Sequence, residues 1–175
     1  MEDEKLIRRI RSGDSEALDE LIRKYYGDIY TYCCRRLGRK PDAEDVTQEV
    51  FLHFCRYFDS YAHRGKCRNF LFTIAHNLCV DALRRKAPVS LEEKDAEDLP
   101  CSDGAQERLE ASDSVRAALN ALPEEQKEAV VLRFYHGFKI KEIARITGSG
   151  LSLTKYRLYQ GLKVLSGLLS KEDWL

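Results

Sequence analysis

A basic run from Arg64 to Lys86 combines charge and aromatic character in a way that suits binding to a polyanion. Its cations are Arg64, Lys66, Arg68, Arg84, Arg85 and Lys86, against the single anion Asp81, for a local charge of +5. At 3.6 residues per turn, Leu71, Ile74, Ala75, Leu78 and Ala82 form one apolar stripe. Such a pattern also fits an ordinary amphipathic helix with a solvated basic face, so the surrounding sequence has to decide between the two interpretations.

The six cysteines and four histidines are the other residues with catalytic or metal-binding potential. Their spacing argues against both roles, because the sequence contains no paired CxxC, no HExxH and no glycine-rich phosphate loop. We therefore expect no catalytic residue, no metal site and no cofactor. We expect small buried thiols in a reducing compartment rather than disulfides.

Charge is segregated along the chain, although the net charge is zero. Residues 59–91 carry six cations and two anions, residues 92–113 carry two and nine, and residues 133–163 carry seven and one. Two basic blocks separated by an acidic one imply two contact surfaces for a polyanion. The N-terminus is charged and no apolar run approaches about 18 residues, so we expect neither a secretory signal nor a membrane span and place the protein in the cytoplasm.

Helices are predicted to position the first basic block. Asp14 can cap a helix N-terminus, and apolar residues then recur at three and four as far as Leu37, where Gly38 and Pro41 end the pattern. The next helix is predicted to begin at Asp42, with apolar residues on one side. Its other side carries Asp45, Gln48 and Glu49.

The second half of the chain is predicted to hold a helix-turn-helix. Residues 89–112 are acidic and contain Pro, Gly and Ser, which is typical of a linker. Helical periodicity then returns and ends in a short helix, a glycine turn and a longer helix from Leu151 to Leu165. Because no segment alternates as a strand does, we predict an all-α chain of two small helical domains, residues 1–88 and 113–175, joined by a flexible acidic linker.

Three blocks of sequence, in order and spacing, resemble the bacterial RNA polymerase sigma factors of the extracytoplasmic-function (ECF) group, small sigma-70 relatives that retain regions 2 and 4. Regions 2.1 and 2.2 are similar to SGDSEALDELIRKYYGDIYTYCCRRLG and DAEDVTQEVFLHF. Regions 2.3 and 2.4 are similar to FDSYAHRGKCRNFLFTIAHNLCVDALRRK, and region 4 to ALNALPEEQKEAVVLRFYHGFKIKEIARITG with LTKYRLYQGLKVL. The resemblance implies a non-enzymatic subunit that binds core RNA polymerase, recognises the −35 and −10 elements and assists strand opening.

The resemblance also implies roles for matching positions of region 2. Asp45, Gln48 and Glu49 would face the coiled coil of the β′ clamp, since an acidic and amide face suits an arginine-rich partner. The loop from Tyr61 to Arg68 would accept a flipped base of the −10 element. The side chains implied in −10 binding are Tyr61, His63, Arg64, Lys66, Arg68, Asn77, Arg84, Arg85 and Lys86. Strand opening needs cations for phosphates and surfaces that replace base stacking, and Phe70 and Phe72 fit either such a surface or the core.

In region 4, the resemblance places the helix from Leu151 to Leu165 in the major groove of the −35 element. The implied base-facing or groove-facing residues are Ser152, Lys155, Tyr156, Arg157, Tyr159, Gln160 and Lys163, while Lys139, Lys141 and Arg145 would hold phosphates. The sequence departs from the family pattern at Ser149 and Gly150, which predicts a looser turn. It departs again at Leu153-Thr154-Lys155, where the family favours Thr-Val-Lys.

The partners implied by the resemblance are core RNA polymerase (β′ clamp and β flap), promoter DNA and an anti-sigma factor, for a protein that is monomeric when free and does not insert into a membrane. The alternative is a free-standing helix-turn-helix regulator that acts without the polymerase. For such a regulator, the run from Arg64 to Lys86 would have no strand to separate. Preceded by an acidic helix and followed by a helix-turn-helix, this run is better explained as a device that captures a melted strand than as a solvated face.

Overall fold

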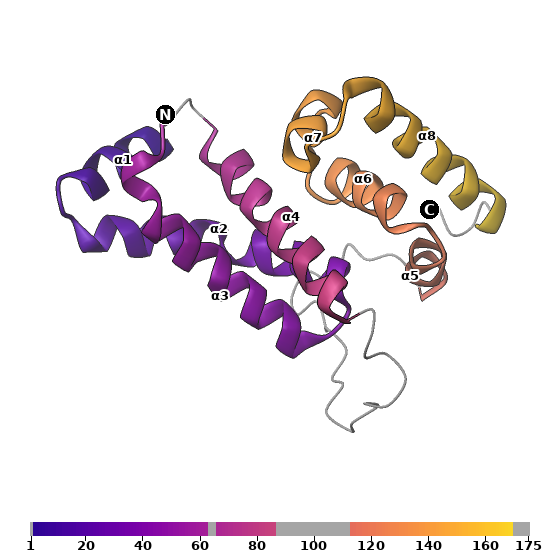
Figure 1. Cartoon of the computed structure of the whole chain (residues 1–175), viewed down its shortest axis with the longest axis horizontal. Helices are drawn as coiled ribbons and strands as arrows, with labels where there is room; N and C mark the ends of the chain where they lie inside the picture. The colour runs from indigo at the N-terminus through magenta and orange to yellow at the C-terminus, as the bar shows by residue number, and fades with distance from the viewer. Residues whose placement is uncertain (1, 63–65, 87–112, 170–175) are drawn as a thin grey trace. The chain divides into compact units, whose positions relative to one another are not determined.

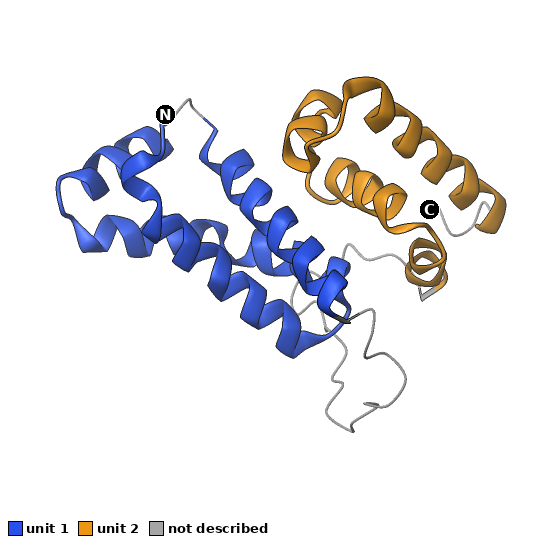
Figure 2. Ribbon diagram, in the orientation of Figure 1, with its two compact units in different colours: residues 1–101 blue, residues 102–175 orange. Residues whose placement is uncertain are grey.

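The computed structural model describes residues 2–62, 66–86 and 113–169, and each regular element in these ranges is a helix. The chain divides into two compact units, residues 1–101 and 102–175 (Figures 1 and 2). The all-α prediction with two helical domains is therefore confirmed. The proposed boundaries at residues 88 and 113 and the acidic linker 89–112 stay predictions, because residues 87–112 lie outside the described ranges.

The first unit contains α1 (Glu2–Arg11), α2 (Ser15–Leu37), α3 (Lys40–Arg56), the short 3₁₀ helix η1 (Phe58–Ser60) and α4 (Cys67–Lys86). The second unit contains α5 (Asp113–Asn120), α6 (Glu124–Phe134), α7 (Ile140–Thr147) and α8 (Leu151–Leu168). Among the described residues, none of these helices combines the length and the apolar character that a membrane span requires.

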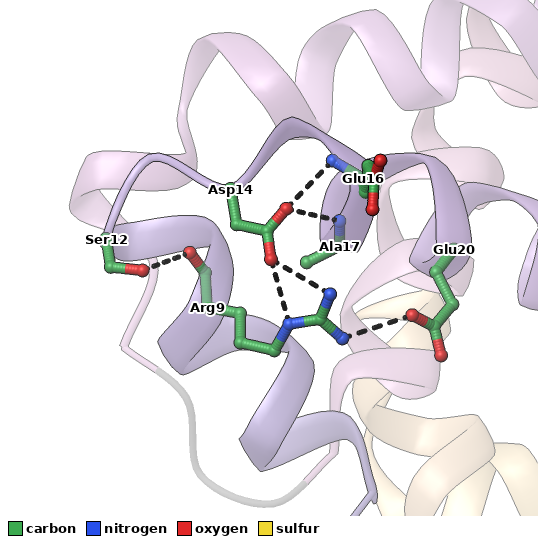
Figure 3. A network of polar contacts seen from close by, with 6 residues as sticks. All are labelled: Arg9, Ser12, Asp14, Glu16, Ala17 and Glu20. Carbon is green, nitrogen blue, oxygen red and sulfur yellow. Dashed lines mark hydrogen bonds and ion pairs between the residues drawn. The ribbon is translucent and has the colours of Figure 1, made fainter.

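Asp14 caps α2 as the sequence predicts. One of its carboxylate oxygens accepts hydrogen bonds from the backbone N–H of Glu16 at 3.0 Å and of Ala17 at 3.3 Å (Figure 3). Its other oxygen pairs with Arg9 of α1 at 2.9 Å, and Arg9 also reaches Glu20 at 3.2 Å. The hydrogen bond from Arg9 holds the pKa of Asp14 below its ordinary value. One carboxylate thus satisfies free N–H groups of α2 and fixes α1 beside it.

Asp3 makes a second connection between α1 and α2. Its carboxylate accepts a hydrogen bond from Lys24 at 2.6 Å and another from the hydroxyl of Tyr25. Burial raises the pKa of Asp3, but the hydrogen bonds from Lys24 and Tyr25 outweigh this effect and leave the pKa below its ordinary value. Burial, followed by the bond to Asp3, raises the pKa of Tyr25, so its hydroxyl stays protonated.

The ends of α2 and α3 are set by a glycine and a proline. Gly38 has a φ of 76°, the left-handed conformation of a helix C-cap, and its N–H donates to the carbonyl of Cys34 at 2.8 Å. Pro41 does not end a helix, as the sequence pattern suggested, but lies in the first turn of α3, which begins at Lys40. A first-turn proline is tolerated because the N–H that it lacks would have had no partner within the helix.

The core of the first unit lies where α4 packs against α2 and α3. Its largest fully buried side chains include Ile29, Tyr32, Phe54, Leu71 and Phe72. Phe72 is therefore a core residue, whereas Phe70 is half-buried. Leu78 and Ala82, predicted in the apolar stripe of α4, are only half-buried, and Cys79 is buried instead. Contact with two neighbouring helices widens the buried face of α4 toward Phe72 and Cys79.

The five cysteines that the structure describes are free thiols. Cys33 and Cys79 meet in the core with their sulfur atoms 3.9 Å apart, and Cys34 and Cys67 are also buried. Cys55, on the outer side of α3, is exposed, contrary to the expectation of buried thiols throughout. Within the described residues, no group of three or more His, Cys, Asp or Glu side chains is arranged to hold a metal ion.

The core of the second unit forms between α5, α6 and α8 and includes Leu119, Leu122, Val130, Leu158 and Leu165. Close approach of α6 and α8 depends on Gly161, because a Cβ there would lie 3.0 Å from Cγ2 of Val130. Helix α7 packs against the other part of α8, with Ile143 and Ile146 buried. This arrangement leaves one side of α8 exposed.

Candidate polymerase and nucleic-acid interfaces

The outward side of α3 is polar and exposed. Asp45, Gln48 and Glu49 are all exposed there, and their spacing of three and four places them on adjacent turns of one face. The opposite side of the same helix buries Val50 and Phe54 in the core, which fixes the direction of this face. The three predicted core-binding residues are thus brought together on a rigid element.

Leu52 extends this face and was missed in the sequence. Its side chain is 58% exposed, and it follows Gln48 by four residues and Glu49 by three. Leu52 therefore adds one apolar side chain to an otherwise polar face. The sequence pattern could have indicated this exposure, because Leu52 lies outside the apolar stripe that contains Val50, Phe51 and Phe54.

Tyr61 is buried rather than presented to a base. Its ring is 8% exposed and stacks on Phe70 with centroids 4.5 Å apart, and the Arg11 guanidinium donates to its carbonyl at 2.7 Å. The neighbouring Cys67 is also buried, and burial raises the pKa of its thiol to about 12. Tyr61 therefore anchors one end of the predicted base-binding loop, and its ring can stack on DNA only if it leaves this cluster.

The rest of the predicted loop is only partly described. His63 and Arg64 lie outside the described residues, and Lys66 is exposed. Arg68 is half-buried, because its guanidinium pairs with Asp28 of α2 at 2.8 Å and lies 5.1 Å from the centre of the Phe72 ring. This geometry makes Arg68 a bridge between α4 and α2 in the free protein rather than an open phosphate contact.

The outer side of α4 carries the remaining candidates for −10 binding. Asn77, Arg84 and Arg85 are all exposed. Asn77 and Arg84 are seven residues apart, or two helical turns, and so share one face, with Arg85 beside it. The side chain of Lys86 lies outside what the structure describes. An amide and two guanidinium groups on one side of a helix can donate hydrogen bonds to phosphates and base edges.

The turn between α7 and α8 is closed rather than loose. Gly148 has a φ of 65°, and the N–H of Ser149 donates to the carbonyl of Ala144 at 3.0 Å, which completes a helix-capping turn. Arg157 of α8 donates from Nη1 to the hydroxyl of Ser149 at 2.7 Å. Ser149 therefore connects the turn to α8, and the looser turn predicted from this serine is not found.

The exposed surface of α7 and α8 presents most of the predicted DNA contacts. Lys139, Lys141 and Arg145 are exposed at the start and along α7. On α8, the exposed residues of the predicted set are Ser152, Lys155, Tyr156, Tyr159 and Lys163, while Gln160 and Arg157 are half-buried. Of these two half-buried residues, Arg157 is bonded to the hydroxyl of Ser149, which directs its guanidinium toward the protein.

Comparison with known proteins gives the same division of the chain. A family model described as Sigma-70 region 2 matches residues 21–89, and one described as Sigma-70, region 4 matches residues 112–165. The ECF RNA polymerase sigma factor SigW of Bacillus subtilis is 29% identical over 174 residues, which cover 92% of this chain and 93% of SigW. The ECF RNA polymerase sigma factor SigM of Mycobacterium tuberculosis is 30% identical over 159 residues, covering 90% of this chain and 80% of SigM.

A solved structure shares the fold. The sigma factor RpoE of Bartonella quintana, crystallised with the anti-sigma factor NepR, matches with a TM-score of 0.71 at 22% identity, over 86% of this chain and 94% of RpoE. Matches to Sigma-70 region 2 in the first unit and to Sigma-70 region 4 in the second identify the class of protein as a sigma factor. The chain belongs to the sigma-70 family of RNA polymerase sigma factors, in its extracytoplasmic-function group. It acts in transcription initiation with RNA polymerase, and the alternative of a free-standing regulator is not supported.

Proposed function

We propose that this chain binds core RNA polymerase through α3, captures the −10 element with α4 and the loop before it, and reads the −35 element with α8. The observation that carries the proposal is that the region 2 and region 4 matches fall on separate units, each with its own exposed polar or basic helix face. The action is binding alone. We therefore propose a non-enzymatic initiation factor that works in the cytoplasm, where polymerase and DNA are found.

For the first unit, core binding is assigned to Asp45, Gln48 and Glu49, with Leu52 added from its exposure. A carboxylate and amide face attracts a cationic partner such as the β′ clamp coiled coil. On α4, Asn77, Arg84 and Arg85 are the described side chains best placed to hold a separated strand, because they are exposed and share one side of the helix. Affinity for phosphates then comes mainly from the two guanidinium groups.

For the second unit, we assign phosphate binding to Lys139, Lys141 and Arg145 and groove binding to the exposed side of α8. The β flap is the proposed polymerase contact of this unit. An anti-sigma factor is also proposed as a partner of this chain, because the RpoE relative was crystallised with one. By analogy, an anti-sigma factor would cover the surfaces that this chain uses for polymerase or DNA.

Core binding can be tested with a matched pair of charge reversals. Glu49→Lys places a cation on the proposed clamp face, while Asp19→Lys makes the same change at an exposed position of α2. Because a like charge at a charged interface is repulsive, Glu49→Lys should weaken binding to core polymerase by about tenfold or more. Asp19→Lys should bind as the parent chain does. Equal losses, or no loss, in a fluorescence titration with core polymerase would contradict the assignment of this face.

Strand opening can be followed by permanganate reactivity of −10 thymines in run-off templates. The pair Arg84→Ala and Arg85→Ala should lower reactivity at saturating holoenzyme, whereas Arg23→Ala, an exposed arginine of α2, should not. The promoter used as the template is first identified by run-off transcription with core polymerase on a genomic promoter library. If the protein directs no promoter-specific transcript with any core polymerase tested, the proposed function fails.

A further inference from the structure

Near its start, the exposed side of α8 carries four large apolar side chains, together with Ser152 and Lys155. Leu151 is 40% exposed, Leu153 45%, Tyr156 59% and Tyr159 61%. They occupy the first two and a half turns, the part of a recognition helix that contacts base edges in helix-turn-helix proteins. Adjacent exposed apolar side chains indicate a contact surface rather than a solvated face.

Two polar side chains of these turns are bonded to the protein, and a third is partly buried, whereas Lys155 is exposed. Arg157 donates to Ser149 at 2.7 Å, and Thr154 is buried with its hydroxyl bonded to the carbonyl of Gly150 at 2.9 Å. Gln160 is half-buried. Lys155 is thus the exposed side chain of these turns that could make a polar contact to guanine, and the other large exposed side chains are apolar.

Cations surround the apolar surface. Lys141 and Arg145 are exposed on the preceding helix, and Lys155 and Lys163 are exposed on α8 itself. By sequence, residues 133–163 hold a single anion, Glu142, whose carboxylate accepts the backbone N–H of Lys139 at 2.8 Å. A cationic margin around an apolar centre complements DNA, whose phosphates flank a major groove where thymine presents a methyl group.

We propose that Leu153 and Tyr156 recognise thymine methyl groups, so that the −35 element of this protein carries thymine at the base pairs they contact. The two residues are three apart on one helix, a rise of about 4.5 Å, which corresponds to methyl groups within about one or two base pairs of each other. This inference rests on the proposed function, because it assumes that α8 enters the major groove of the −35 element.

The test replaces each −35 thymine, one at a time, by deoxyuridine, which removes the methyl group and keeps every hydrogen-bonding group. Binding of the holoenzyme, assembled from the full chain and core polymerase, is measured on a promoter found by run-off transcription. Loss of one methyl contact should weaken binding by about three- to fivefold at one or two thymines. Leu153→Ala should bind the thymine and uracil promoters equally at one of these positions.

A control variant separates this contact from a general loss of apolar surface. Leu168→Ala removes a side chain that is 55% exposed in the last turn of the same helix, and this holoenzyme should keep the full sensitivity to uracil. A uracil effect that disappears in Leu153→Ala and persists in Leu168→Ala supports the proposal.

Three other outcomes overturn the proposal, and they differ in whether the −35 role of α8 survives. If scrambling the −35 element changes binding but uracil substitution does not, the methyl contact is wrong and the −35 role of α8 survives. The same conclusion follows if Leu153→Ala lowers the affinity for the thymine promoter and for the uracil promoter by the same factor, so that the difference between them persists. This result is expected if the surface binds a protein partner. If scrambling the −35 element has no effect, the proposed −35 role itself fails.

Discussion

Gly161 offers a sharp test of how the second unit is packed. A Cβ at this position would lie 3.0 Å from Cγ2 of Val130 and 3.4 Å from the carbonyl oxygen of Gln126. Ordinary contacts begin near 3.4 Å, so Val130, itself a core residue, would have to yield by a few tenths of an ångström. Alanine gains about 1 kcal/mol over glycine in a helix, whereas overpacking of this kind costs about 1–3 kcal/mol. Gly161→Ala should therefore destabilise the second unit by about 1 kcal/mol.

Gly167 supplies the matched control on the same helix. A Cβ there would meet nothing within 4 Å, so Gly167→Ala should keep the benefit of helix propensity and stabilise the unit by about 0.5–1 kcal/mol. Native-state hydrogen exchange with mass spectrometry measures the opening free energy of α6 and α8 in the full chain, separately from the first unit. If Gly161→Ala stabilises α8 as much as Gly167→Ala does, the close approach of α6 and α8 does not require glycine, and the packing argument is refuted.

Three further predictions concern the first unit. A double-mutant cycle with Arg68→Ala and Asp28→Ala should give a coupling energy of about 1 kcal/mol in unfolding, and a value near zero would return Arg68 to the set of open DNA contacts. Alkylation by N-ethylmaleimide, followed by mass spectrometry, should modify Cys55 well before Cys67, because Cys67 is buried and its pKa is raised to about 12; equal rates would contradict this burial. Asp3→Asn should lower the free energy of unfolding at neutral pH. Because the pKa of Asp3 is lowered in the folded state, the difference in unfolding free energy from the parent should shrink as the pH falls below the ordinary carboxylate pKa of about 4. A difference that does not depend on pH would refute the role of its charge.

Local backbone chemistry explains which parts of the fold could be predicted. Asp14 and Gly38 were placed correctly because a capping carboxylate and a glycine with positive φ act on residues within one turn of themselves. Pro41 was ambiguous, since proline can follow one helix or start the next. The buried face of α4 was predicted less well, because the choice between Leu78 and Cys79 depends on two neighbouring helices that periodicity along a single helix does not show.

The same distinction applies to the candidate sites. Asp45, Gln48 and Glu49 were expected on the side of α3 opposite its apolar stripe, and they are exposed there. Arg68 was assigned to DNA because the sequence could not show that Asp28, 40 residues earlier, would bind it. Tyr61 was assigned to a base for a similar reason, as its partner Phe70 meets it only after the chain turns into α4.

In both units, an arginine from the region predicted to bind DNA connects two parts of the protein. Arg68 joins α4 to α2, and Arg157 joins α8 to the turn at Ser149. Because a guanidinium that is already paired contributes less to phosphate or guanine binding, affinity must come from the exposed cations that remain, and these attract any DNA sequence. Under the proposed thymine recognition, discrimination between promoters depends in part on uncharged groups that respond to base identity, and Leu153 and Tyr156 are exposed on α8 for this role. The serine at the turn holds Arg157, and Leu153 is exposed on the same helix. The proposed methyl contact therefore predicts that the two departures from the family pattern act together.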